Sequence, residues 1–184
     1  MTTEKFDLVV KFKDSLRDEN VNDEQNPDEL LGIEEIVFAL SGKDPELYIK
    51  ESEFFNIMLV ELGTDSMEAA KELNKSNPQI ISSIVPINKV VRTDLLEIVN
   101  SLGELAVDKM DPGDNFAVDS YVVTNKDIKS KEILNKVEKK LKKLDMNLEE
   151  KNPKWKIFVE VIGENTGLSI LKVDESQICE CNSK

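Results

Sequence analysis

Apolar and polar residues alternate along the first half of the chain in a way that predicts strand, helix, strand, strand, helix, strand. This order is that of the split β-α-β, ferredoxin-like arrangement. The expected strands are 6–12, 46–50, 54–62 and 80–85, and the expected helices are 28–40 and 67–74. The apolar stripe of the first helix is formed by Leu30, Ile33, Val37 and Leu40. We therefore expect these four residues to face a sheet.

The second half of the chain predicts two amphipathic helices, a strand between them, and an apolar hairpin after them. In the hairpin, Asn165-Thr166-Gly167 offers residues that tolerate positive φ in a turn. The expected helices are 94–110 and 129–144, and the expected extended segments are 116–124, 146–149, 155–163 and 167–173. We therefore expect an α+β protein with an N-terminal ferredoxin-like domain at 1–90, an α/β domain at 91–175, and a polar, disordered tail at 176–184.

The chain as a whole is strongly acidic. It has 184 residues and a formal net charge of −13, with 24 Lys and Arg against 37 Asp and Glu. An acidic chain repels a phosphate backbone, which argues against nucleic-acid binding unless the charge is unevenly distributed. The sequence shows no apolar run of membrane-spanning length and no signal-peptide pattern, so we expect a cytoplasmic protein without membrane contact.

Few residue patterns in the sequence support catalysis. The absence of His removes the usual general base near neutral pH and the commonest metal ligand. Nucleotide-binding loops and nucleophile elbows are missing, and the acidic segment 14–29 lacks the spacing of a calcium loop. Cys179 and Cys181 offer two thiols to a soft metal or to oxidation, but a disordered terminus supplies no third ligand. We therefore expect no enzyme activity, no cofactor and no metal site.

Basic residues gather in one segment of this acidic chain. Residues 1–62 hold sixteen Asp and Glu against six Lys and Arg, whereas residues 126–156 hold eleven Lys against six Asp and Glu. In the helix expected at 129–144, lysines form a stripe beside the apolar face, and such a stripe can follow a phosphate backbone. The alternative is a solvated helix surface whose lysines cover the edge of the sheet. The candidate RNA contacts are Lys129, Lys136, Lys139, Lys140 and Lys143, with Lys154 and Lys156 extending them from the hairpin.

Four segments of the C-terminal half together resemble a THUMP domain, the ancillary RNA-binding module of thiouridine synthases, RNA methyltransferases and pseudouridine synthases. They are TDLLEIVNSLGELAVDKM, PGDNFAVDSYVV, IKSKEILNKVEKKLKKL and NPKWKIFVEVIGENTGLSILK. A ferredoxin-like unit followed by such a domain is similar to the stand-alone THUMP proteins related to the adaptor of tRNA cytidine acetylation. The resemblance identifies 91–175 as a THUMP α/β domain. It implies tRNA binding without catalysis, with a separate RNA-modifying enzyme as partner.

The resemblance also concerns individual positions. The segment IVPINKVVRT resembles the join between the two domains in this family, and Arg92 is carried over from it as an RNA contact. Family members usually carry basic residues in the strand where this chain has Asp119, Ser120 and Tyr121, and acidic or neutral groups there weaken phosphate contact. The lysine stripe compensates for them if it shares one face with Arg92.

Two hypotheses about function remain open from the sequence. The first is an RNA-binding adaptor that presents tRNA to a modifying enzyme. The second is an acidic protein-interaction or regulatory module that kept the THUMP fold and lost RNA binding. Trp155 leaves a similar choice, because a single Trp can stack on a base, although its alternating apolar neighbours favour a place in the core.

Overall fold

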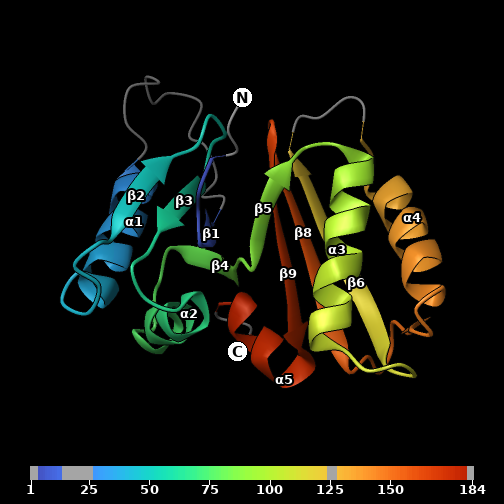
Figure 1. Ribbon diagram of the computed structural model, residues 1–184. Coiled ribbons are helices and arrows are strands. Elements are labelled where there is room, and N and C mark those ends of the chain that lie inside the picture. Colours follow the sequence, from blue (N-terminus) through green and yellow to red (C-terminus); the bar gives the residue numbers. More distant parts are fainter. Residues whose placement is uncertain (1–3, 14–26, 124–127, 182–184) are drawn as a thin grey trace. The chain divides into compact units, whose positions relative to one another are not determined.

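The computed structural model describes residues 4–13, 27–123 and 128–181, which divide into two compact units (Figure 1). The N-terminal unit comprises Phe6–Pro86 and Ile178–Lys184, and the C-terminal unit comprises Ile87–Gln177 and Met1–Lys5. The division falls four residues before the boundary expected at residue 90. Each unit therefore includes a short segment from the opposite end of the chain.

The N-terminal unit has the ferredoxin-like fold that its sequence pattern predicts. Its elements are β1 (Leu8–Phe12), α1 (Pro27–Leu40), β2 (Tyr48–Glu51), β3 (Ile57–Glu61), α2 (Ser66–Lys75) and β4 (Ile81–Pro86). The strands form one antiparallel sheet in the order β2-β3-β1-β4. The two helices contact each other, α1 contacts β1, and α2 contacts β4. This order and connectivity confirm the split β-α-β arrangement.

Helix α1 turns a different face to the sheet than the sequence suggests. Leu40 is buried as expected, whereas Leu30 is 56% and Val37 is 42% exposed. Gly32 explains the orientation, because a Cβ at this position would lie 2.4 Å from the ring of Phe12. The helix thus approaches β1 along a residue that has no side chain. The prediction that Leu30 and Val37 face the core was wrong.

The C-terminal unit is a sheet with both of its long helices on one face (Figure 1). Its elements are β5 (Lys89–Arg92), α3 (Leu95–Lys109), β6 (Asn115–Val123), α4 (Ser130–Lys142), β7 (Asn147–Leu148), β8 (Trp155–Ile162) and β9 (Asn165–Lys172). The strand order is β5-β9-β8-β6-β7, with β6 parallel to both of its neighbours and the other pairs antiparallel. Helix α3 packs on β5 and β9, and α4 packs on β6 and β7.

Strand β5 was expected only as a join between the two domains. It pairs with β9 through Val90 opposite Gly167 and Val91 opposite Thr166, and so forms one edge of the sheet. Four residues are too few to show a period in the sequence. The strand is determined by the edge of β9, whose backbone groups it satisfies.

The hairpin turn lies earlier than predicted. Ile162 pairs with Asn165, so the loop between β8 and β9 consists of Gly163 and Glu164. The φ of Gly163 is 60°, and a glycine at positive φ in the first loop position is typical of a type II′ turn. The turn predicted at residues 165–167 was therefore misplaced, because Asn165 already belongs to β9.

The described end of the chain is ordered and packed, contrary to the disordered tail expected at 176–184. After a short helix, α5 (Val173–Ser176), the backbone N–H of Cys181 donates to the carbonyl of Ser82 at 3.0 Å. Cys179 and Cys181 are both buried. Burial, followed by the nearby carboxylate of Glu35, raises the pKa of the Cys181 thiol to about 11. Cys181 therefore packs in the core of the N-terminal unit as a protonated thiol.

Candidate nucleic-acid interface

Helix α4 carries most of the candidate RNA contacts, and its apolar face fixes how they are presented. Ile133, Val137 and Leu141 are fully buried against the sheet and α3. Their spacing of four residues places them in one row along the helix. The last turn holds Lys139, Lys140 and Lys142, where cations interact favourably with the carboxyl end of the helix dipole. The remaining surface of the helix is therefore basic.

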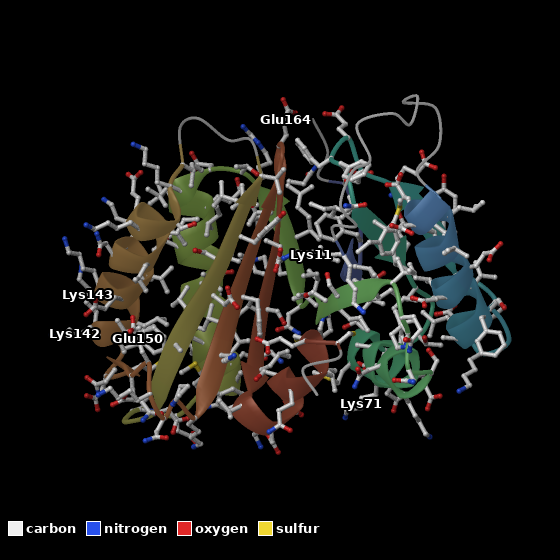
Figure 2. The ribbon with its side chains drawn as sticks, turned by 180° about the vertical axis from the view of Figure 1, so that it is seen from behind. Lys11, Lys71, Lys142, Lys143, Glu150 and Glu164 are labelled. Atoms are coloured by element: carbon white, nitrogen blue, oxygen red, sulfur yellow. The ribbon has the colours of Figure 1, made fainter. Side chains whose placement is uncertain are left out.

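The lysines predicted from the sequence occupy the exposed part of α4 and its two caps. Lys136 and Lys139 are exposed, as are Lys129 at the N-cap and Lys143 at the C-cap, while Lys140 is half-buried. Figure 2 shows Lys142 and Lys143 projecting outward from the carboxyl end of the helix. The structure therefore brings these predicted residues together on one element.

Lys140 lies across the neighbouring helix. Its Nζ is 3.4 Å from Oδ1 of Asn100 on α3, and its aliphatic carbons pass over Gly103. Lys136 and Lys143 are four residues before and three residues after Lys140, so they share its side of α4. This row of three lysines follows the seam between α3 and α4. The stripe predicted from sequence periodicity is present.

Lys154 is held by an acidic partner instead of projecting freely. Its Nζ lies 2.6 Å from Oδ1 of Asp114, and the indole N–H of Trp155 donates to Oδ2 of the same carboxylate at 2.8 Å. The hydrogen bond to Asp114 raises the pKa of Lys154. The hydrogen bond from Lys154 lowers the pKa of Asp114 despite its burial. Trp155 is only 7% exposed, which places it in the core and leaves no ring face for a base.

Asp114 belongs to a loop that packs against the residues following α4. The N–H of Gly113 donates to the carbonyl of Asp145 at 2.6 Å, and the N–H of Asn147 donates to the carbonyl of Asp114 at 3.0 Å. These bonds place Lys154 at the same end of the unit as Lys143. The neighbouring Asp114 offsets the charge that Lys154 adds there.

Arg92 and Lys156 lie apart from the α4 lysines. Arg92 is exposed at the end of β5, and β5 is the edge strand opposite the β7 edge beside α4. Lys156 alternates with the core residues Trp155 and Ile157, so it lies on the sheet face without helices. The expectation that Arg92 shares one face with the lysine stripe was therefore wrong.

The acidic and neutral positions of β6 are separated from the lysine stripe. Val118 pairs with Ile157 on the helix side, so Asp119 and Tyr121 point to the opposite face of the sheet. Ser120 lies on the helix side. The Asp119 carboxylate therefore does not oppose a phosphate bound along α4.

Two further lysines of α4 were not among the predicted contacts. Lys131 and Lys142 are both exposed, on the flank of the helix away from the row of Lys136, Lys140 and Lys143. The helical projection excluded them because it followed one narrow stripe. The sequence could have identified them, because the helix buries only its apolar face and every lysine outside that face reaches solvent.

The described part of the chain contains no group of three or more His, Cys, Asp or Glu side chains arranged to hold a metal ion. Across the same residues, none of the helices combines the length and the apolar character that crossing a membrane requires.

Comparison with solved structures places the chain among known folds. PH1313 from Pyrococcus horikoshii Ot3 is similar with a TM-score of 0.68 and 19% identity, over 91% of this chain and 54% of that one. A 4-thiouridine synthetase solved as an RNA complex with bound ATP gives 0.59 and 13%, over 96% and 42% of the two chains. TrmN from Thermus thermophilus gives 0.57 and 14%, over 89% and 44%. The likeness is one of fold, and this chain spans about half the length of these proteins.

Comparison by sequence gives one family. Residues 92–171 match the THUMP domain, from the end of β5 to the penultimate residue of β9. A search of curated proteins gave no match.

Proposed function

Residues 92–171 of this chain form a THUMP domain, and from this we propose that the protein binds tRNA and presents it to a separate RNA-modifying enzyme. The family match is the observation that carries the proposal, because the THUMP domain is an RNA-binding module. A similar fold in a 4-thiouridine synthetase solved with RNA supports it.

The lysines of α4 suit contact with the RNA backbone. Lys136, Lys139 and Lys143 are exposed ammonium groups, which pair with phosphates as point charges and lack the planar fork that reads base edges. Lys140 is held above α3 and extends the same row. Binding through these groups depends on the shape and charge of the RNA more than on its sequence.

We further propose that the protein acts without catalysis of its own. A sequence with no His, no nucleotide-binding loop and no nucleophile elbow offers few groups for chemistry on RNA. A separate enzyme, such as a cytidine acetyltransferase, would then supply the reaction. The second candidate function is a protein-interaction module without RNA binding, which is favoured by the exposed apolar side chains of α1.

Filter binding of bulk tRNA at about 50 and 200 mM salt tests RNA binding directly. If three or four lysines each neutralise a phosphate, affinity falls between about tenfold and a hundredfold over this range. Replacing Lys136 and Lys143 with Gln lowers the slope of log K against log salt by up to about two. The matched control replaces Lys71 and Lys75 of the N-terminal unit with Gln, which changes the net charge equally and leaves binding unchanged.

Three outcomes contradict specific tRNA binding through the lysines of α4. If tRNA is not retained at the lower salt, the protein-interaction hypothesis replaces it. If the control pair weakens binding as much as Lys136 and Lys143 do, the retention is non-specific electrostatics. If Arg92→Gln alone abolishes binding, the site lies on the opposite edge of the sheet.

A further inference from the structure

Helix α1 exposes four large apolar side chains that lie close together on the helix. Leu30 is 56%, Leu31 46%, Val37 42% and Phe38 84% exposed. Together they present on the order of 400 Å² of accessible surface, a size that is often functional on a monomer. The fold does not need these side chains, because Ile36 and Leu40 already supply the buried face of the helix.

The carboxylate of Glu34 lies in the middle of this exposed apolar surface. Glu34 follows Leu30 by four residues and Leu31 by three, and it precedes Val37 by three residues and Phe38 by four. At about 100° per residue, all five side chains fall within an arc of about 120° on the outward side of the helix. Helix α1 contains no Lys or Arg, so its outward face is apolar with a single negative charge at its centre.

This combination restricts what covers the face. Burial of Glu34 against an apolar surface without a cation is costly, so an occupant must bring a positive charge to the centre of its own apolar surface. A second copy in a two-fold dimer would place Glu34 near its own symmetry mate, where the two carboxylates repel. RNA and anionic lipid are disfavoured because the N-terminal unit is acidic.

We propose that the outward face of α1 is a docking site for a protein segment that carries an apolar stripe with a Lys or Arg at its centre. The site lies in the N-terminal unit and does not depend on tRNA binding by the THUMP domain. The apolar surface is about half of what each partner buries in a stable complex, so the contact is reversible. Such a segment on a modifying enzyme would join it to the adaptor.

Two synthetic amphipathic helices of about 18 residues and identical composition test the proposal. The first carries a Lys at the centre of a Leu stripe. In the second, that Lys is exchanged with a Gln of the polar face, so the net charge is unchanged. In fluorescence anisotropy, the protein is expected to bind the first peptide about tenfold more tightly, because only that Lys reaches Glu34.

Variants at exposed positions connect binding to α1. Phe38→Ser is expected to weaken binding of the first peptide by about tenfold, because it removes the most exposed apolar group. Glu34→Gln is expected to remove the preference between the peptides. Leu96→Ser, at a residue 69% exposed on α3, is the matched control and leaves binding unchanged. Thermal unfolding and tRNA retention of all three variants are measured alongside.

Several outcomes overturn the proposal. The proposal fails if the two peptides bind equally, or if Leu96→Ser weakens binding as much as Phe38→Ser does. A dimer in sedimentation that Phe38→Ser dissociates would identify a second copy as the occupant. Retention of the protein by vesicles of anionic lipid, lost in Phe38→Ser, would identify a membrane surface instead. Phe38→Ser is expected to leave tRNA retention unchanged in every case, so failure of docking is distinguishable from failure of RNA binding.

Discussion

Asp114 joins a candidate RNA contact to the core of the THUMP domain, so its replacement tests both. Its carboxylate accepts from Nζ of Lys154 at 2.6 Å, from the indole N–H of Trp155 at 2.8 Å and from the N–H of Asp111 at 3.1 Å. In Asp114→Ala, the indole N–H of a residue only 7% exposed loses its acceptor. In Asp114→Asn, the amide oxygen still accepts from the indole, but the charge beside Lys154 is gone.

The expected loss follows from the number of polar groups left without a partner. A buried donor without an acceptor costs about 1–3 kcal/mol, so Asp114→Ala is expected to lower the free energy of unfolding by about 2 kcal/mol. With a urea dependence of about 2 kcal/mol per M, the midpoint falls by about 1 M. Asp114→Asn is expected to cost less than half as much. Trp155 is the single Trp of the chain, so its fluorescence reports this unit directly.

The pH dependence gives the same pair of groups a second signature. The folded pKa of Asp114 lies below its ordinary value of 3.8, so its contribution is present above that value and is lost as pH falls through the folded pKa. The folded pKa of Lys154 lies above its ordinary value of 10.5. Its contribution is present below 10.5 and is lost as pH rises through the folded pKa. The stability difference between wild type and Asp114→Asn is therefore expected to be constant from about pH 5 to pH 9 and to shrink outside that window.

Two results would refute this account of Asp114. The first is an Asp114→Ala variant within about 0.3 kcal/mol of wild type, which would show that the indole finds another acceptor. The second is equal destabilisation by Asn and Ala. On the RNA side, Asp114→Asn is expected to steepen the salt dependence of tRNA binding by up to about one, because Lys154 is released. An unchanged slope removes Lys154 from the interface.

Two further predictions concern single positions in each unit. Asp44 is buried and accepts from the N–H groups of Gly63 and Thr64 and from the Thr64 hydroxyl, and these bonds lower its pKa although burial raises it. Asp44→Ala is expected to lower the free energy of unfolding by about 2–3 kcal/mol. In the wild type, the contribution of Asp44 is expected to be lost in acid, as the pH falls below 3.8 and through the lowered folded pKa. Urea unfolding followed by circular dichroism measures both effects. Gly103→Ala is expected to raise the free energy of unfolding by about 0.5–1 kcal/mol, because only the flexible Lys140 side chain lies within 3 Å of the new Cβ. A loss of stability in the same measurement would show that Lys140 cannot move away from α3.

The sequence predicts where a helix lies better than which way it faces. Helix α1 carries two apolar rows, and counting apolar positions selected the row of Leu30, Ile33, Val37 and Leu40. Leu30 and Val37 of that row are exposed. The deciding residue is Gly32, whose contact with Phe12 cannot be anticipated because the two residues are brought together only by the fold. In α4 the charged residues leave one apolar row, and there the predicted face is buried.

The candidate site shows the same limit. The lysines of α4 were predictable because residues on one helix have fixed relative positions. The ion pair that holds Lys154 was not predictable, because its partner Asp114 is 40 residues away in sequence. Arg92 was expected beside the lysine stripe because the segment around it resembles the join between domains in THUMP proteins. The strand order of the sheet places Arg92 and the stripe at opposite edges. The spacing of apolar and charged residues along one element cannot predict positions that depend on the order of strands in a sheet.

The net charge of −13 is compatible with RNA binding once it is divided between the two units. Ile87–Gln177 holds seventeen Asp and Glu against fifteen Lys and Arg, a balance of −2, whereas Phe6–Pro86 holds eighteen against seven, a balance of −11. Exposed charges more than about 10 Å apart are largely screened at ordinary salt, so a phosphate on α4 responds to the lysines nearest to it. The acidity of the N-terminal unit instead disfavours RNA on its own surface and favours a cationic protein segment at Glu34. The charges of the two units therefore suit different partners, which is consistent with the proposed adaptor role.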